Sequence, residues 1–269
     1  MGCRDITWGY ARNVAGDKKA MAAVSVIEKY MLHTLYRVDL VIGVSYGITG
    51  KLVEGGLNAE KTITVSNGIS SDLMEEIMRR TADNVQKRRP IVAYAGLIGY
   101  NQRLSVLVEA TSSLPEVDLI LVGDGSELTL LKKKAADLGV KNVKFRGYLD
   151  RENLLELYSE SDILIAHARS TPTIDATMVP VKLFEYMATG RPIICAGRSV
   201  GADLLRQIGR VEKVPPGDRE ASGNAVKRLL HESEMARSLG LKGQTRVRSD
   251  FHRDKLMEEL AQTLKERFG

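Results

Sequence analysis

From Pro90 onward, short apolar runs alternate with helix-period segments, and this alternation constrains the fold more than any other feature of the sequence. The apolar runs predict strands at 91–95, 118–122, 143–145, 162–166, 192–195 and 211–214. The segments between and after them predict helices at 104–113, 127–138, 152–159, 181–188, 202–207 and from 219 to about 232. Strands that alternate with helices form a parallel sheet covered by helices. We therefore predict an α/β fold with a doubly wound parallel sheet, whose ligand site lies beyond the carboxyl ends of the strands.

The first 66 residues do not continue this pattern. They predict helices near 20–35 and 46–54, and two strands at 38–44 and 62–66. Because two strands do not form an independently stable sheet, we interpret residues 1–66 as the remnant of a second lobe. Asn67-Gly68 predicts a turn, and residues 72–87 a polar helical connector.

The other two divisions are a main domain at 67–250 and a terminal segment at 251–269. The terminal segment predicts a helix over 255–267 with Leu256, Leu260 and Leu264 on one stripe. An apolar stripe at this spacing is expected to pack against another part of the molecule.

Composition narrows the function classes. The 269 residues are 43% hydrophobic and 27% charged, which is typical of a globular protein. Aromatic residues make up 5%, which argues against a stacking surface for single-stranded nucleic acid. The formal net charge of +5 suits an anionic small ligand or an anionic membrane surface. We expect no nucleic-acid partner.

Cysteine usage and hydropathy indicate the compartment. Cys3 and Cys195 are the two cysteines, so a disulfide framework is excluded and a reducing compartment is favoured. No apolar run reaches the ~20 residues of a membrane span, and the amino terminus lacks the layout of a signal peptide. We expect a cytoplasmic protein, with a peripheral contact to the inner face of the membrane as an open alternative.

Ligand patterns of metal enzymes are absent from the sequence. The histidines are far apart and show no ligand spacing: His33, His167, His231 and His252. No phosphate-binding GxxxxGK[ST] loop occurs. We expect no metal and no cofactor, and we interpret His167 as a core or rim histidine.

Three segments follow directly after predicted strands, where a doubly wound sheet keeps its ligand. The first, Gly96 to Arg103, has glycines that would let a phosphate approach the next helix, although a plain strand-to-helix turn fits equally well. In Gly123-Asp124-Gly125 we favour a structural turn for Asp124 and a role in shaping the cleft for the glycines. Gly147-Tyr148-Leu149 could contact a base edge, but an ordinary loop is the simpler interpretation.

The fourth segment, Pro180 to Pro192, carries most weight. Lys182 and Glu185 lie one turn apart on a helix that follows a Ser/Thr/Pro-rich loop, so its first N–H groups would face an anion. The alternative is a Lys–Glu surface pair worth a few tenths of a kcal/mol. Because of its position in the fold, we favour a functional role for this segment.

In order, these segments resemble the nucleotide-sugar half of a retaining glycosyltransferase of family 4, which has the two-lobed GT-B fold. The resemblance rests on seven segments in register: 65–69, 94–96, 122–125, 143–147, 157–162, 182–188 and 214–218. Residues 38–45 look like the last part of the family's first lobe, and Pro180-Val181-Lys182 is most similar to transferases that build microbial surface polysaccharides.

The resemblance implies sugar transfer from a nucleoside-diphosphate sugar with retention and without an essential metal. It implies catalytic roles for Lys182 and Glu185, with Glu185 also holding the ribose hydroxyls, and it favours a UDP-sugar over a GDP-sugar. The implied nucleotide-binding residues are Gly96, Gly99, Gln102, Arg103, Gly123, Gly147, Tyr148, Leu149 and Glu185. The implied residues for the donor sugar or the diphosphate are Asp175, Thr177, Met178, Val179 and Lys182.

Three departures from the family pattern set the alternatives. The family's acidic residue for the donor sugar falls at Thr177, with Asp175 nearby as a substitute. The Arg and Lys that the family has beside the first glycine segment correspond here to Leu97 and Gln102. The positive charge that binds the diphosphate would therefore come from Lys182, Arg103 or Arg169. The family's acceptor lobe corresponds here only to residues 1–66.

We therefore expect activity if a second chain, or a longer form, supplies the acceptor half. One alternative is a non-catalytic nucleotide-sugar-binding module. Another is an inactive truncated product that is oligomeric or aggregation-prone. An epimerase of the same two-lobed architecture is a more remote one.

Overall fold

The computed structural model describes residues 1–3, 6–82, 88–196, 201, 204 and 212–269. Its larger part is a parallel sheet of six strands in the order β6-β5-β4-β7-β8-β9. The strands are β4 (Ile91–Ala95), β5 (Asp118–Val122), β6 (Val143–Gly147), β7 (Ile163–His167), β8 (Ile193–Ala196) and β9 (Glu212–Val214). The order reverses between β4 and β7, and the crevice at such a reversal is where doubly wound sheets bind ligands. The predicted fold class is confirmed.

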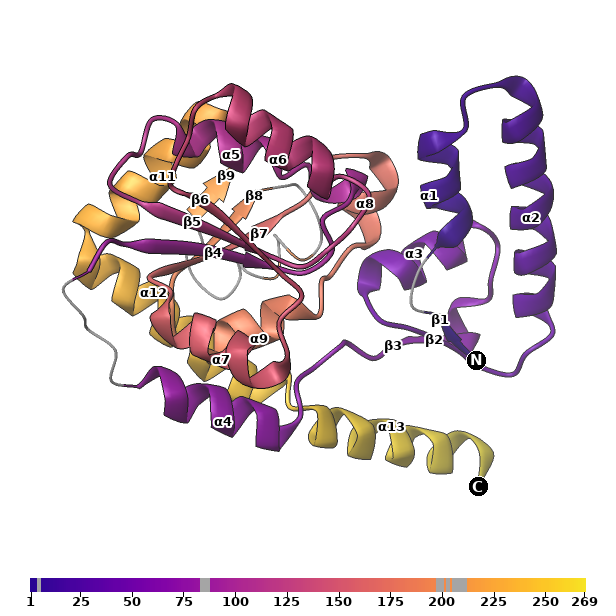
Figure 1. Ribbon diagram of the computed structural model, residues 1–269. Helices are drawn as coiled ribbons and strands as arrows, with labels where there is room; N and C mark the ends of the chain where they lie inside the picture. The colour runs from indigo at the N-terminus through magenta and orange to yellow at the C-terminus, as the bar shows by residue number, and fades with distance from the viewer. Residues whose placement is uncertain (4–5, 83–87, 197–200, 202–203, 205–211) are drawn as a thin grey trace.

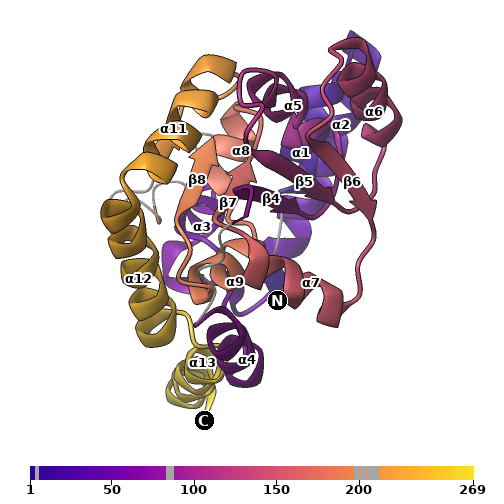
Figure 2. The ribbon, with the colours of Figure 1, turned by 60° about the vertical axis from the view of Figure 1, so that its left-hand side comes forward.

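Helices cover both faces of this sheet (Figure 1, Figure 2). One face carries α4 (Ser71–Thr81), α7 (Arg151–Glu160) and α9 (Lys182–Ala188). The other carries α5 (Ser105–Thr111), α6 (Leu128–Asp137) and α11 (Arg219–His231). Helix α12 (Ser233–Asp250) contributes Ala236 to one core and Val247 to the other. Because both faces are covered, the strands are buried along their whole length except for the outer strands β6 and β9.

Several predicted boundaries need correction. Part of the segment before Pro180 is not a loop but helix α8 (Pro172–Thr177), which Thr171 caps and Pro172 begins. Helix α9 begins at Lys182 after an N-cap at Val181, one residue later than predicted. Helix α4 is more than a polar connector, because it buries Met74, Ile77 and Met78 in the core. The helix predicted over 202–207 falls outside the described residues except at Leu204.

The first 66 residues form a small unit with three strands rather than the expected two. Parallel strands β1 (Gly2–Cys3), β2 (Val41–Gly43) and β3 (Thr62–Thr64) pair in that order. Around them lie α1 (Thr7–Val14), α2 (Lys18–Tyr36), α3 (Tyr46–Glu54) and the 3₁₀ turn η1 (Ala59–Lys61). This unit has a core of its own, which includes Trp8, Leu35 and Leu52. A strand of two residues carries too little periodicity to be recognised in a sequence.

The small unit packs against the larger one through α8. Helices α1 and α3 contact α8, and the Ser45 hydroxyl donates a hydrogen bond of 3.0 Å to the carbonyl of Thr177. Helix α13 (Arg253–Phe268) extends back under the small unit (Figure 1), and Arg267 donates to the carbonyl of Glu60. The expected packing of its stripe is only partly correct, because no side chain of α13 is buried and Leu264 is 37% exposed.

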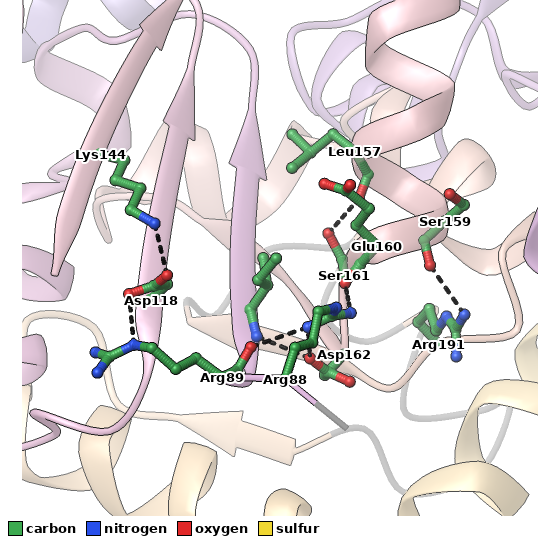
Figure 3. A network of polar contacts seen from close by, with 11 residues as sticks. Arg88, Arg89, Asp118, Lys144, Leu157, Ser159, Glu160, Ser161, Asp162 and Arg191 are labelled. Atoms are coloured by element: carbon green, nitrogen blue, oxygen red, sulfur yellow. Dashed lines mark hydrogen bonds and ion pairs between the residues drawn. The ribbon is translucent and has the colours of Figure 1, made fainter. Parts of the chain in front are cut away.

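A network of ion pairs lies at the amino-terminal edge of the large sheet, opposite the carboxyl ends of its strands (Figure 3). Asp118 accepts hydrogen bonds from Arg89 Nε at 3.1 Å and from Lys144 Nζ at 2.7 Å. Asp162 accepts from Arg88 Nη1 at 2.9 Å and from the backbone N–H of Ile91 at 2.7 Å. Burial would raise the pKa of Asp118, but the neighbouring Lys144 and Arg89 outweigh it and hold this pKa below its usual range.

We expect the Asp118 carboxylate to stabilise the fold above its ordinary pKa and to lose that effect in acid. Asp118→Asn should lower the free energy of unfolding at pH 7 by about 1 kcal/mol, since both cationic partners are half-exposed. The difference from wild type should shrink at about pH 3, as the carboxyl of the wild type takes up its proton. Urea unfolding at both pH values tests this, with Asp137→Asn on the exposed side of α6 as the control. A difference of equal size at both pH values would contradict it.

Candidate functional site

Glycines bring the loops after three neighbouring strands into direct backbone contact. The N–H of Gly96 donates to the carbonyl of Val122 at 2.9 Å, and the N–H of Gly123 donates to that of Gly147 at 2.7 Å. A Cβ on Gly123 would lie 1.9 Å from the Gly96 carbonyl oxygen, and its φ of +125° also requires glycine. The Asp124 carboxylate accepts from the N–H of Gly125 at 2.7 Å, which supports the structural interpretation of that turn. These loops form a rigid floor at the carboxyl ends of β4, β5 and β6.

Lys182 lies beside this floor as a cation without a carboxylate partner among the described residues. Its Nζ is 3.8 Å from the ring centroid of Tyr94, and a Cβ on Gly96 would lie 2.6 Å from the same Nζ. Burial lowers the pKa of Lys182 to about 7, although the Glu185 carboxylate acts to raise it. The alternative of a Lys182–Glu185 surface pair is therefore wrong, because the two side chains have different partners.

Glu185 is oriented by a set of buried tyrosines. The Tyr158 hydroxyl donates to Glu185 Oε2 at 2.8 Å, and the rings of Tyr158 and Tyr186 meet edge to face with centroids 5.7 Å apart. The Tyr186 hydroxyl accepts from the N–H of Ala95 at 2.9 Å, which ties the set to β4. Burial, Tyr186 and Glu185 together raise the pKa of Tyr158 well above its usual value, so it stays a proton donor. Oε2 of Glu185 is thus engaged, whereas Oε1 has no hydrogen bond to any residue in the described ranges.

In the segment between α8 and α9, two of the predicted site residues have hydrogen-bonding groups engaged within the protein. The N–H of Met178 donates to the carbonyl of Ile174 at 3.0 Å, so it is not available to an anion. Thr177 is buried, and its hydroxyl donates to the carbonyl of Thr173 at 2.7 Å. Asp175 accepts a hydrogen bond from Ser170, while its Oδ1 is buried without a partner. Of Thr177 and Asp175, which the sequence analysis considered for the donor sugar, Asp175 therefore has a carboxylate oxygen without a hydrogen-bond partner in the described residues.

Gln102 is the last residue of the short 3₁₀ turn η2 (Tyr100–Gln102), which starts after Gly99. Arg103 follows this turn directly. Arg103 has a left-handed backbone with φ +46°, and its guanidinium lies against Gly217. The carbonyl of Gln102 accepts from His167 Nδ1 at 2.6 Å, while Gln102 Oε1 is buried without a partner. His167 is 3% exposed, as expected for a core histidine.

Gly147, the last residue of β6, has φ +65°. After it, Tyr148 is 85% exposed, whereas Leu149 packs on the core beneath α4, α7 and α9. This arrangement leaves the backbone and ring of Tyr148 accessible at the same edge as the glycine floor.

A cleft of about 890 Å³ separates the two units on the ligand side. Its walls come from the strand ends of the small unit, from Asn101 and Gln102, and from the Thr177–Val181 segment. Arg253, Met257 and Leu260 close it from α13. A cavity of this size accommodates a small organic ligand.

The described residues hold neither a metal-binding cluster nor a membrane-spanning helix. Within the described ranges no group of three or more His, Cys, Asp or Glu side chains is placed to hold a metal ion. No helix among them has the length and apolar character needed to cross a membrane.

The family model described as "Glycosyl transferases group 1" matches residues 76–246. Among curated relatives, the sulfoquinovosyl transferase SQD2 of Arabidopsis thaliana is 27% identical over 75% of this chain and 40% of its own. The lipopolysaccharide core biosynthesis glycosyltransferase LpsE of Rhizobium meliloti is 27% identical over 65% of this chain and 49% of its own. The chain thus spans half or less of the length of these relatives.

The fold is also that of solved GT-B glycosyltransferases. The Anabaena protein Alr3699/HepE, solved in complex with UDP-glucose, superposes with a TM-score of 0.73 at 20% identity, over 88% of this chain and 67% of that one.

We expect Gly123→Ala to disrupt the floor of the site. The added Cβ would collide with the Gly96 carbonyl, so the free energy of unfolding should fall by about 3 kcal/mol or more. Gly139→Ala is the matched control, because Gly139 also has a positive φ but has no atom within 4 Å of a built Cβ. It should cost about 1 kcal/mol. Equal losses in thermal or urea unfolding would show that the loop contact is not tight.

Proposed function

Because the chain belongs to the glycosyl transferases group 1 family, we propose that it forms the nucleotide-sugar-binding half of a retaining, metal-independent glycosyltransferase of family 4. The observation that carries this proposal is the separate setting of Lys182 and Glu185, one an unpaired cation and the other a carboxylate with an unused oxygen. Both lie at the edge of the sheet where the strand order reverses.

In this proposal Glu185 holds the ribose. A carboxylate can accept two hydrogen bonds at once, which suits adjacent ribose hydroxyls. Tyr158 fixes the orientation of Glu185 through Oε2, so Oε1 remains to accept from the sugar. Gly147, Tyr148 and Leu149 would lie against the base, and Gly96, Gly99 and Gly123 would allow close approach of the nucleotide.

Lys182 holds the diphosphate in this proposal. Transfer breaks the bond between the anomeric carbon and the diphosphate, and negative charge gathers on the departing group. A preoriented cation at that place stabilises the transition state more than the ground state. The Tyr94 ring keeps Lys182 Nζ next to Gly96, where no side chain intervenes. Val179 and Asp175 would lie near the diphosphate and the donor sugar.

A UDP-sugar is the favoured donor, supported by the UDP-glucose complex of the Anabaena structure. Surface polysaccharide or glycan synthesis is the favoured process, supported by the relative that acts in lipopolysaccharide core biosynthesis. The acceptor half would come from a longer form of the chain, a second chain or another copy. In this proposal the enzyme acts at the inner face of the membrane, where surface polysaccharides or glycans would be built.

The second candidate is a nucleotide-sugar-binding module without transfer activity of its own. It shares the donor site, so nucleotide binding alone does not separate the two candidates, whereas transfer to an acceptor in the presence of a partner chain does.

We expect Glu185→Gln to weaken uridine and UDP equally, by about tenfold or more, because both carry the ribose hydroxyls. Calorimetric titration without metal measures both affinities. Glu152→Gln, on the exposed side of α7, is the control and should change neither. Unchanged uridine binding in Glu185→Gln would remove the ribose assignment.

We expect Lys182→Met to weaken UDP much more than uridine. With a pKa near 7 in the unliganded protein, Lys182 is charged below that pH and must take up a proton to bind UDP above it. The UDP affinity of the wild type should therefore fall several-fold per unit between about pH 7 and pH 9, and Lys182→Met should lack this fall.

Lys227→Met on the exposed face of α11 serves as the control. Equal losses for UDP and uridine in Lys182→Met, or the same pH dependence as wild type, would contradict the phosphate role.

A further inference from the structure

Helix α2 carries large apolar side chains on the side that faces away from the rest of the protein. Its inner side packs on α1 and buries Val24 and Leu35. On the outer side, Val26 is 67% exposed, Ile27 52% and Tyr30 70%. Because Tyr30 follows the other two by three and four residues, the three side chains are neighbours on the helix surface and form one α2 patch. Exposed apolar side chains that form a contiguous patch mark interaction sites, whereas scattered ones need no explanation.

Lysines lie on both sides of the α2 patch along the helix. Lys18 and Lys19 are in the first turn of α2, and Lys29 is near its middle. All three are exposed, and none forms an ion pair with a residue that the structure describes. Lys19 lies two turns before Val26 on the same face, and Lys29 lies one turn after Val26. The apolar patch therefore has unpaired positive charge before it and beside it.

The carboxylates near these lysines are engaged or lie off the outer face. In α2, whose residues are all described, Glu28 is the one acidic side chain, and it pairs with Arg12 of α1. Asp17 precedes the helix and caps it by accepting a hydrogen bond of 2.7 Å from the N–H of Ala20. Asp39 lies beyond the carboxyl end of the helix. The outer face of α2 is therefore both apolar and cationic.

The α2 patch lies apart from the candidate donor site. Helix α2 is on the outer side of the small unit, away from the large sheet (Figure 1). Among the residues that line the cleft of about 890 Å³ between the two units, none belongs to α2. A partner bound to the patch would thus leave the cleft open to a nucleotide and an acceptor.

This combination of side chains matches the surface of an anionic membrane. Val26 and Ile27 would enter the boundary between headgroups and acyl chains, and Tyr30 would place its ring there with its hydroxyl among the headgroups. Lysines extend their charged ends to lipid phosphates while their stems stay on apolar surface. A second copy of the chain matches less well, because two such faces packed together would oppose lysines to lysines and offer no carboxylate to pair with them.

We propose that the α2 patch, together with Lys18, Lys19 and Lys29, docks the chain on a membrane surface that contains anionic phospholipids. The helix would lie in the plane of the interface, with its inner side still packed on the small unit. Burial of the patch and attraction to the lipid phosphates would act together. The docking surface stands on the side chains of α2, whereas its use in bringing sugar transfer to the membrane rests on the proposed function.

The test is flotation of the whole chain with phospholipid vesicles in the absence of nucleotide. One set of vesicles contains phosphatidylcholine alone, and the other contains equal parts of phosphatidylcholine and phosphatidylglycerol. The chain should bind the anionic vesicles and not the neutral ones. High salt should weaken this binding, because it screens the attraction between the lysines and the lipid phosphates.

Two double variants of α2 separate the apolar contribution from the charged one. Val26→Gln with Tyr30→Gln, and separately Lys19→Gln with Lys29→Gln, should each lower the affinity for anionic vesicles by about tenfold or more. Glutamine is a good helix former and all four side chains are exposed, so the thermal unfolding midpoint should not change.

Leu130→Gln with Lys133→Gln is the matched control, because α6 also exposes a leucine and a lysine. It should leave vesicle binding unchanged. Equal binding to both kinds of vesicle, or unchanged binding in the two α2 variants, would overturn the docking surface. A chain that binds no vesicle would overturn it as well. If that chain is instead a dimer that Val26→Gln with Tyr30→Gln dissociates in sedimentation, the patch belongs to a second copy.

Titration of the same proteins with UDP separates this proposal from the proposed function. The α2 variants should bind UDP as the wild type does, because α2 lies outside the cleft. If UDP fails to bind while vesicle binding depends on α2, the proposed function fails and the docking surface remains. If UDP binds and no vesicle does, the docking surface fails and the donor site remains.

Discussion

The contact between the loops after β4 and β5 determines the rest of the site. Gly123 approaches the Gly96 carbonyl more closely than any residue with a side chain could. This contact holds Gly96 at the place where Lys182 Nζ arrives from α9, and it continues through the Gly123 N–H to Gly147 after β6. The glycines therefore do two things at once. They join three strand ends into one floor, and they keep side chains out of the space above it.

Charge is distributed unevenly between the two ends of the sheet. At the amino-terminal edge, Asp118 and Asp162 are paired with Arg88, Arg89 and Lys144, so this edge is stabilised and closed. At the opposite edge Lys182, Arg103 and Arg169 contact aromatic rings, carbonyls or a glycine instead of carboxylates. Unpaired cations in a partly buried place favour anionic ligands. Among the described residues, these three cations without carboxylate partners lie at the edge of the sheet where doubly wound folds bind ligands.

The sequence predicted the large sheet because its strands are buried on both faces and read as continuous apolar runs, such as Asp118–Val122. It missed β1 and α8, because a strand of two residues and a helix of six carry little periodicity. Lys182 and Glu185 were recognised from the motif, but their separate partners, Tyr94 and Tyr158, come from strands and helices far away in the chain. The engaged N–H of Met178 was equally beyond sequence, since it depends on α8.

The central claim is that Lys182 and Glu185 bind one nucleoside diphosphate between them, with Glu185 on the ribose and Lys182 on the diphosphate. A crystal structure of the chain soaked with UDP in metal-free buffer tests this most directly. The account predicts ribose hydroxyls within hydrogen-bond distance of Glu185 Oε1 and diphosphate oxygens within ion-pair distance of Lys182 Nζ, over the glycine floor. UDP bound elsewhere, or bound with its diphosphate on Arg103 and Arg169 instead, would contradict it.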